Sequence, residues 1–343
     1  MKNKSNRNAV FAVTLLPFLI SGCATRAHEM TRQLLEGNEA ALRGDFTTAA
    51  MHYETALEEV PSSAPAKRNL GIVLVKSGNY KRAKEILTEV AREYSTDVEL
   101  YYFLGEACRG LEEFQNAATN YQKALRIQPD DHRVQKALAW TWHKVGLYDR
   151  ALLIALPLFK KNPSDLQLRL IIGSTYNKQK KYPDTIELLA PLEKAKFQIQ
   201  SKDKVSGDSE RALLMTALGD AYSGTQNCER GGPLYTEVLK TRPFLATALT
   251  GSARCDLRTP NPDGNSNQKA LTKLERAVKS DPDATEAHFL LAKLSEKIDN
   301  NRAIFYYRRF LLLSKDDTSF TAEARAARSS LAGLERKTAT SAH

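Results

Sequence analysis

Apolar positions recur along most of this chain at the three- and four-residue spacing of amphipathic helices. Between residues 98 and 131 two such patterns follow one another, the first around Leu104 and the second beginning at Phe114. Pro129 ends the second pattern, because proline lacks the backbone N–H that a helix interior requires. The segment therefore predicts two helices joined by a short turn. A lone pair cannot bury its apolar face, so we expect copies of this unit to stack.

The same pattern returns every 34 residues through the first half of the chain. Gly105 and Ala117 allow two helices to approach closely, while the larger Tyr121 fills the space around them. The small residues of the first helices are Gly37, Gly71, Gly105, Ala139 and Gly173, the alanines of the second are Ala49, Ala83, Ala117 and Ala151, and the turn aromatics are Phe46, Tyr80, Phe114, Tyr148 and Tyr182. This combination resembles the tetratricopeptide repeat (TPR). The resemblance implies an all-α fold, a right-handed α-solenoid of about eight TPR helix pairs with a C-terminal capping helix.

The period and its interruptions divide the chain into segments. Gly219 comes 12 residues later than the period requires, which indicates an insertion before it. A cluster of Pro, Asn and Gly between Arg258 and Gln268 enlarges a later turn. The predicted segments are a lipoprotein signal peptide at 1–22, the lipidated Cys23 and a tether at 23–30, a regular array of five repeats at 31–195, an inserted loop at 196–210, an irregular array of three repeats at 211–317, a capping helix at 318–336 and a disordered tail at 337–343.

The N-terminus has the order of a secretory signal. Three cations precede about twelve apolar residues, a run too short to span a bilayer. The tetrad Ile20-Ser21-Gly22-Cys23 resembles the bacterial lipobox, in which the signal is removed before a cysteine that then carries the lipid. The resemblance implies anchoring through acyl chains on Cys23. Because Ala24 rather than aspartate follows, it also implies the periplasmic face of the bacterial outer membrane.

The net charge indicates the kind of partner, and the expected compartment bears on the state of the cysteines. The formal net charge of +10 falls to about +7 once the signal is removed, which favours acidic protein or envelope polymer, and the compartment makes nucleic acid an unexpected partner. The periplasm is oxidising. Cys228 and Cys255 fall at facing elements of successive repeats, so one prediction is a disulfide between them and the alternative is two free thiols. Cys108 is interpreted as a small buried hydrophobe.

Sequence motifs of enzymes are not found. No two of the six histidines lie three to five residues apart, as a helical metal site requires. The phosphate-binding loop, the GxGxxG fingerprint and the GxSxG nucleophile elbow are also missing from the sequence. We therefore expect a binding protein with no metal, cofactor or small-molecule substrate. The alternative is an enzyme whose site lies in the irregular C-terminal repeats.

The resemblance to TPR proteins also implies where a partner binds. In that family first helices line a concave groove, which takes a protein partner as an extended peptide or a helix. The positions carried over to this sequence are Arg68, Ile72, Lys76, Tyr102, Glu106, Arg109, Arg133, Lys136, Trp140, His143, Lys144, Asn177 and Lys178. The middle of the groove is expected to be basic and aromatic. The carboxylate clamp of cochaperone TPRs is not carried over, because Leu34 stands where that clamp needs lysine although Asn38 is present.

Two tryptophans lie close together in the fourth repeat. Trp140 and Trp142 point in different directions on one helix, so we expect one of them to be exposed. An exposed Trp140 beside cations would resemble a binding hot spot. The alternative is that Trp140 packs on the adjacent first helix and is structural.

The repeats and the lipid signal together resemble TPR lipoproteins such as the pilotins of type IV and tight-adherence pili. This resemblance implies a lipid-anchored periplasmic scaffold that mediates protein–protein interactions, for example in assembling a pilus or an outer-membrane secretin. An adaptor for peptidoglycan-modifying enzymes is the alternative within the same class.

Overall fold

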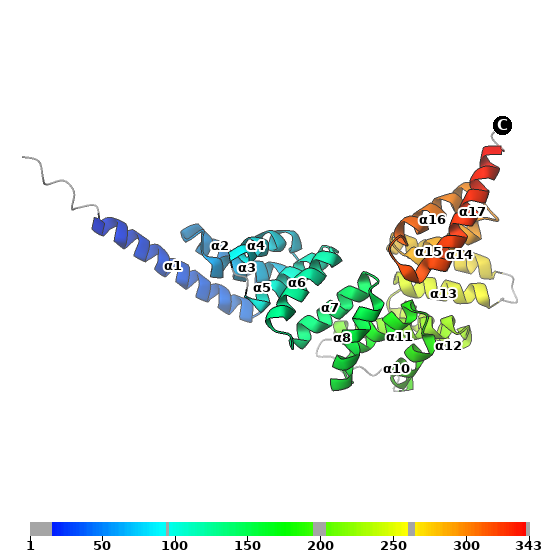
Figure 1. Ribbon diagram of the computed structural model, residues 1–343, viewed down its shortest axis with the longest axis horizontal. Helices are drawn as coiled ribbons and strands as arrows, with labels where there is room; N and C mark the ends of the chain where they lie inside the picture. The colour runs from blue at the N-terminus through cyan, green and yellow to red at the C-terminus, as the bar shows by residue number, and fades with distance from the viewer. Residues whose placement is uncertain (1–15, 94–95, 195–203, 260–264, 341–343) are drawn as a thin grey trace, which may run out of the picture. The chain divides into compact units, whose positions relative to one another are not determined.

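The computed structural model describes residues 16–93, 96–194, 204–259 and 265–340. These residues form seventeen α-helices and one short 3-10 helix, with no strand among them (Figure 1). The predicted all-α fold is confirmed. The chain divides into two compact units, Met1–Val134 and Gln135–His343.

The first unit consists of three helix pairs. Each helix contacts the next along the chain, and α3 also contacts α5, so these two first helices lie against one another. The bounds are α1 (Leu16–Leu42), α2 (Phe46–Glu59), α3 (Ala64–Lys76), α4 (Tyr80–Glu93), α5 (Val98–Gly110) and α6 (Phe114–Ile127).

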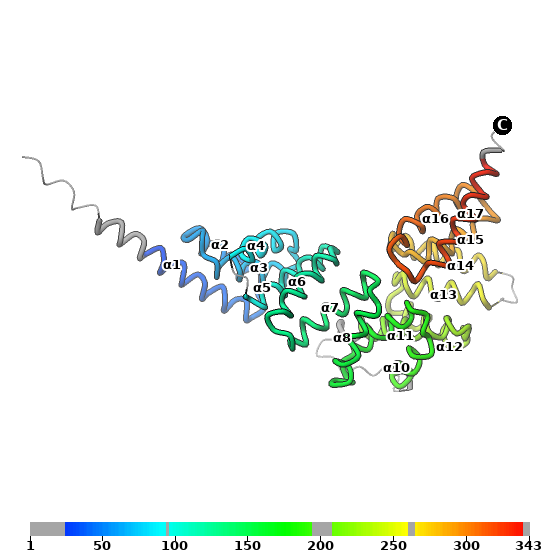
Figure 2. Tube along the Cα trace, viewed as in Figure 1, coloured from blue at the N-terminus to red at the C-terminus, as the bar shows by residue number. Residues whose placement is uncertain are grey.

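The second unit begins within α7 (His132–Lys144) and repeats the same arrangement. The first helices again contact one another, α9 with α11, α11 with α13 and α13 with α15. Figure 2 shows the chain passing through these helices from green to red. The bounds are α8 (Tyr148–Lys161), α9 (Leu166–Lys178), α10 (Tyr182–Lys194), α11 (Lys204–Gly224), α12 (Cys228–Thr241), α13 (Ala246–Arg258), α14 (Ser266–Ser280), α15 (Thr285–Ser295), α16 (Asn300–Leu313), η1 (Thr318–Phe320) and α17 (Thr321–Thr340).

A close contact inside several of the helix pairs explains the small residue that recurs in the sequence. A Cβ atom added to Gly105 of α5 would lie 2.5 Å from Cε1 of Tyr121 in α6, closer than side-chain atoms approach. The Tyr121 hydroxyl donates to Glu106, the residue after that glycine, at 2.5 Å. The same contact and hydrogen bond link Gly37, Asn38 and Tyr53, and again Gly219, Asp220 and Tyr235. The small residue therefore makes room for the tyrosine ring, as the sequence predicted.

The turn inside each of the first six helix pairs uses one residue in the left-handed region. Gly146 occupies this position with φ of 80°, and Lys180 occupies it in the next repeat with φ of 60°. Glycine adopts this conformation readily, whereas for a residue with a side chain it costs roughly 1 kcal/mol or more.

First helices often begin at an aspartate that accepts a hydrogen bond from a backbone N–H, as Asp97 does from Leu100 and Asp165 from Leu168.

Two boundaries near the N-terminus and the insertion differ from the prediction. Residues 24–30, expected to be a tether, are part of α1, because nothing in this stretch is a proline or glycine that would end the helix. Residues 204–210, expected in the inserted loop, form the start of α11. Residues 196–203 of that loop and residues 1–15 of the signal lie outside the described residues. Cys23 lies within α1, and its side chain is outside what the structure describes.

The C-terminal boundaries also differ. The predicted capping helix is present as α17, but residues 318–320 form the 3-10 helix η1 before it. Residues 337–340, expected in a disordered tail, continue α17, since no proline or glycine follows Gly333 to end the helix. Residues 341–343 lie outside the described residues.

Candidate partner-binding surfaces

Four of the expected groove residues form one cluster in the first unit, which we call the Tyr102 cluster: Tyr102, Glu106, Arg109 and Arg133. The guanidinium carbon of Arg133 lies 4.1 Å from the centre of the Tyr102 ring. Arg109 donates to Glu106 at 2.5 Å. Burial, and then the negative charge of Glu106, raise the pKa of Tyr102 to about 12, so its hydroxyl stays neutral at physiological pH.

Two other expected groove cations link neighbouring first helices. Arg68 in α3 pairs with Asp97 at the start of α5 at 2.5 Å, and Lys136 in α7 pairs with Asp165 at the start of α9 at 3.0 Å. Burial alone would raise the pKa of Asp97, but the hydrogen bonds from Arg68 and from backbone N–H groups outweigh it and lower that pKa. Each aspartate therefore caps one helix and holds the preceding first helix.

The expectation of a basic groove needs correction, because carboxylates neutralise most of the cations that were expected to line it. Five of the expected cations lie within 3.0 Å of a carboxylate oxygen: Arg68, Arg109, Arg133, Lys136 and Lys178. Lys76 instead lies over the rings of Phe46 and Phe103. Sequence reasoning identified Glu106 but missed the other acids, although aspartates that precede first helices keep the 34-residue period at 97, 131 and 165. The groove residues are thus largely charge-balanced.

The two tryptophans of α7 are both half-buried, so the expectation that one is exposed is wrong. Trp140 packs against the core cluster that includes Ala139 and Leu152, and the Lys144 ammonium lies 5.4 Å from its ring centre. Arg150 lies 5.9 Å from the ring centre of Trp142. Packing of the second unit covers part of each ring, which agrees better with the structural interpretation of Trp140.

His143 and Asn177 make hydrogen bonds inside the second unit. The Thr175 hydroxyl donates to the Ile171 carbonyl oxygen at 2.6 Å, so Nδ1–H of His143 donates to the Thr175 oxygen at 3.0 Å. Burial, and then the positive charges of Lys178 and Lys144, lower the pKa of His143 to about 3. Asn177 donates to the Ala217 carbonyl oxygen at 2.7 Å and so joins α9 to α11. Both side chains are therefore held in place by their own unit.

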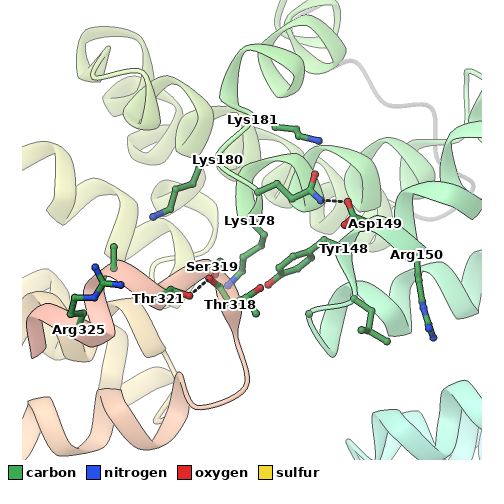
Figure 3. Close-up of a pocket in the computed structure, with 14 residues that line it drawn as sticks. Tyr148, Asp149, Arg150, Lys178, Lys180, Lys181, Thr318, Ser319, Thr321 and Arg325 are labelled. Atoms are coloured by element: carbon green, nitrogen blue, oxygen red, sulfur yellow. Dashed lines mark hydrogen bonds between the residues drawn. The ribbon is translucent and has the colours of Figure 1, made fainter. Parts of the chain in front are cut away.

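The segment Asp317–Arg325, which we call the C-terminal segment, lies against the fourth and fifth repeats. Tyr148 donates its hydroxyl hydrogen to Asp317 at 2.8 Å, and Lys178 donates to the other carboxylate oxygen at 2.9 Å. Burial alone would raise the pKa of Asp317, but Lys178 and hydrogen bonds from Ser319 and Tyr148 lower it to about 2. Lys180 pairs with Glu323 at 3.2 Å. In Figure 3 the side chains of Tyr148 and Lys178 extend toward Thr318 and Ser319 of this segment.

A pocket of about 790 Å³ lies beside these contacts. Residues from 146–150, 178–181 and 318–325 line it, so three segments distant in sequence build its wall. Five lining residues are cations, Arg150, Lys178, Lys180, Lys181 and Arg325, and only Asp149 is a carboxylate. Gln179 donates to Asp149 at 2.8 Å. Sequence reasoning identified Lys178 alone among these residues, because no sequence pattern connects the C-terminal segment to the fourth repeat.

A second charge cluster links three first helices of the second unit. Arg254 of α13 donates two hydrogen bonds to Glu286 of α15, at 2.7 and 2.6 Å, and a longer one to Asp220 of α11 at 3.4 Å. Asp220 also accepts from the Tyr235 hydroxyl at 2.7 Å. Burial raises the pKa of Asp220, and the charge of Arg254 opposes this rise. Such a network fixes the relative positions of the helices.

Cys228 and Cys255 form a disulfide in the structure, with Cα atoms 5.4 Å apart, and so join the start of α12 to the end of α13. Cys108 is a buried free thiol, and burial raises its pKa. Among the described residues no three His, Cys, Asp or Glu side chains gather as a metal site would require. Within the same residues, no helix has the length and apolar character needed to cross a membrane.

Sequence models of the tetratricopeptide repeat match residues 40–106, 98–131 and 263–298. The crystal structure of a tetratricopeptide repeat protein from Parabacteroides merdae superposes with a TM-score of 0.58 at 14% identity, covering 78% of this chain and 99% of that one. The chain therefore contains TPR repeats, and its fold is an all-α TPR solenoid.

Two further similarities are more distant. The structure of Pseudomonas aeruginosa pilF superposes with a TM-score of 0.49 at 15% identity, covering 65% of this chain and 96% of that one, and it adds nothing to the fold assignment. Outer envelope protein 61 of Arabidopsis thaliana is 30% identical over 112 residues, which are 30% of this chain. The match spans only 20% of the length of that protein.

Proposed function

We propose that this chain is a lipid-anchored periplasmic scaffold that holds a protein partner on the first helices of its first unit and helps to assemble an outer-membrane complex such as a pilus or a secretin. TPR repeats bind proteins rather than transform small molecules in most cases, which supports the scaffold. The lipobox-like tetrad that ends at Cys23 supports the anchor. The resemblance to pilotins supports the narrower assembly role.

The Tyr102 cluster carries this proposal. Tyrosine and arginine dominate the few residues that supply most of the energy in protein interfaces. Arg133 and Arg109 keep 43% and 39% of their side-chain surface exposed. Ion pairs and ring stacking fix their positions before a partner arrives, which lowers the entropy cost of binding. A partner with a carboxylate or an aromatic side chain would find both chemistries in one place.

Crosslinking in cells tests the partner. A photoreactive residue at Tyr102 is expected to crosslink to a component of an outer-membrane assembly, identified by mass spectrometry. The matched control is the same residue at Gln115, an exposed position on α6 of the same unit. The same products from both positions would contradict the proposed surface. Products from peptidoglycan hydrolases or synthases would instead favour the adaptor function.

Substitution of the lipid-bearing residue tests the anchor. Cys23→Ser is expected to move the protein from the membrane fraction to the soluble periplasmic fraction and to abolish acylation of the mature N-terminus. The measurement is fractionation together with the intact mass of the purified protein. A variant that remains with the outer membrane would show that something other than Cys23 holds the chain there.

A further inference from the structure

The pocket beside the C-terminal segment has more positive charge than its own chain neutralises. Lys178 pairs with Asp317, and Lys180 pairs with Glu323. Arg150, Lys181 and Arg325 have no carboxylate partner within the part of the chain that the structure describes. A pocket with unmatched cations attracts anions, because its field raises their local concentration.

The positions of the three unmatched cations suggest the kind of anion. Arg150 belongs to α8, Lys181 to the turn before α10, and Arg325 to α17. In the view of Figure 3 they lie on three different sides of Tyr148 and Lys178. A single small anion would reach one of these cations, whereas a chain with several carboxylates would reach all three.

The contact between Asp317 and its partners shows that this region already binds a carboxylate. Tyr148 and Lys178 hold the two oxygens of Asp317 separately, at 2.8 and 2.9 Å. Lys180 keeps a left-handed backbone, with φ of 60°, while its ammonium reaches Glu323. The turn residues of the fourth and fifth repeats thus bind acidic side chains of a neighbouring helix.

We propose that this pocket is a second binding site of the protein, and that its ligand is an acidic peptide segment of a partner protein. The carboxylates of the segment pair with Arg150, Lys181 and Arg325, and the 790 Å³ volume accepts a few residues of such a peptide. The C-terminal segment forms one wall of the pocket, so binding requires that Asp317 remains attached to Tyr148 and Lys178. The site does not depend on the Tyr102 cluster.

Fluorescence anisotropy with the full-length protein in detergent tests the proposal. The probe is a short labelled peptide in which glutamate alternates with serine, and the reference peptide has glutamine in place of glutamate. We expect the glutamate peptide to bind and the glutamine peptide to bind at least about tenfold more weakly. Equal binding of the two peptides, or no binding of the glutamate peptide, would overturn the proposal.

Charge-removing variants locate the site. Arg150→Gln, Lys181→Gln and Arg325→Gln combined are expected to weaken binding of the glutamate peptide by about tenfold or more. The matched control combines Lys160→Gln, Lys161→Gln and Arg328→Gln, three exposed cations on α8 and α17 that do not line the pocket. An equal loss in the control would show that overall charge, rather than the pocket, attracts the peptide.

Two further measurements test which kind of anion binds and whether the C-terminal segment supports or competes with binding. Inorganic phosphate that displaces the peptide as well as unlabelled glutamate peptide does, at equal ionic strength, would make this a small-anion site and overturn the peptide proposal. Asp317→Asn is expected to weaken binding, with Asp316→Asn as the exposed neighbouring control. Tighter binding by Asp317→Asn would show that the segment competes with the ligand and would also contradict the proposal. Tyr102→Ala is expected to bind the peptide as the unsubstituted protein does. The peptide experiment can therefore fail while the proposed function of the Tyr102 cluster stands, and the reverse also holds.

Discussion

In the third helix pair one side chain, Tyr121, sets how closely the two helices approach. Tyr121 is fully buried, and its ring lies where the side chain of any residue other than glycine at 105 would be. Its hydroxyl donates a hydrogen bond to Glu106. The ring therefore fixes the distance between the two helices, and the hydroxyl fixes their register. The small residue found by the 34-residue period is therefore required by a contact with the neighbouring helix.

Gly105→Ala tests this steric requirement. The added Cβ forces the Tyr121 ring to move, so we expect the free energy of unfolding to fall by about 1 to 2 kcal/mol even though alanine favours the helix. Gly232→Ala is the control, because no atom lies within 4 Å of its added Cβ, and it is expected to be neutral or slightly stabilising. Urea unfolding followed by circular dichroism measures both. Equal effects would mean that helix propensity, not the contact, determines the residue.

His143 makes the stability of the second unit depend on pH. Burial and the charges of Lys178 and Lys144 lower its pKa to about 3 in the folded protein from the usual 6.5, while Asp317 opposes them. The unfolded chain thus binds more protons between these values. The stabilisation is complete above pH 6.5 and is lost as the pH falls toward 3, by roughly 1 kcal/mol per pH unit.

Replacement of this histidine tests the effect. His143→Gln is expected to flatten the dependence of the unfolding free energy on pH between about pH 4 and pH 7. His132→Gln removes an exposed histidine and serves as the control. The measurement is the urea midpoint at several pH values. A slope unchanged by His143→Gln would assign the dependence to other groups.

Neighbouring helices are joined by polar links at their ends as well as by apolar packing. Arg68 with Asp97 and Lys136 with Asp165 use the residue that caps the following first helix. Arg254 binds carboxylates from the first helices on both sides. The disulfide Cys228–Cys255 adds a covalent link between α12 and α13. Because each repeat contacts mainly its neighbours, such links transmit stability along the array.

Removal of the Cys228–Cys255 disulfide tests how much this covalent link between α12 and α13 stabilises the second unit. Cys228→Ala combined with Cys255→Ala is expected to lower the free energy of unfolding of the second unit by about 3 kcal/mol, since the bond closes a loop of 27 residues in the unfolded chain. Urea unfolding with and without reductant measures this difference. The double variant should not respond to reductant, and Cys108→Ala should keep the response. Two free thiols in the unreduced intact protein would contradict the prediction.

At the scale of the whole molecule, the C-terminal segment does more than cover the last apolar face. Asp317 reaches residues 169 and 139 positions earlier in the chain, at Tyr148 and Lys178. The Phe320 ring lies 4.7 Å from the Lys178 ammonium. The fourth and fifth repeats are thus held by the end of the chain, which also builds one wall of the pocket.

Asp317→Ala tests this long-range link. Loss of the carboxylate leaves Lys178 and Tyr148 without their partner, so the amides of 146–150 and 178–181 are expected to exchange with solvent faster. Hydrogen exchange measured by mass spectrometry follows these segments, and α3 and α5 of the first unit are expected to keep their rates. Asp316→Ala is the control, because this side chain is exposed. Unchanged exchange at both turns would show that the link contributes little.

The sequence by itself determined the helix pairs, their period and the residues that face the core, because these depend on local spacing and on the size of side chains at fixed positions. It also placed Cys228 and Cys255 at facing elements. Only the tertiary structure decided which carboxylates pair with Arg68, Lys136 and Lys178, since their partners Asp97, Asp165 and Asp317 stand at the starts of other elements. The pocket likewise needed the tertiary structure, because contacts between Tyr148 and Asp317 follow from how the repeats curve, and no local pattern encodes that curvature.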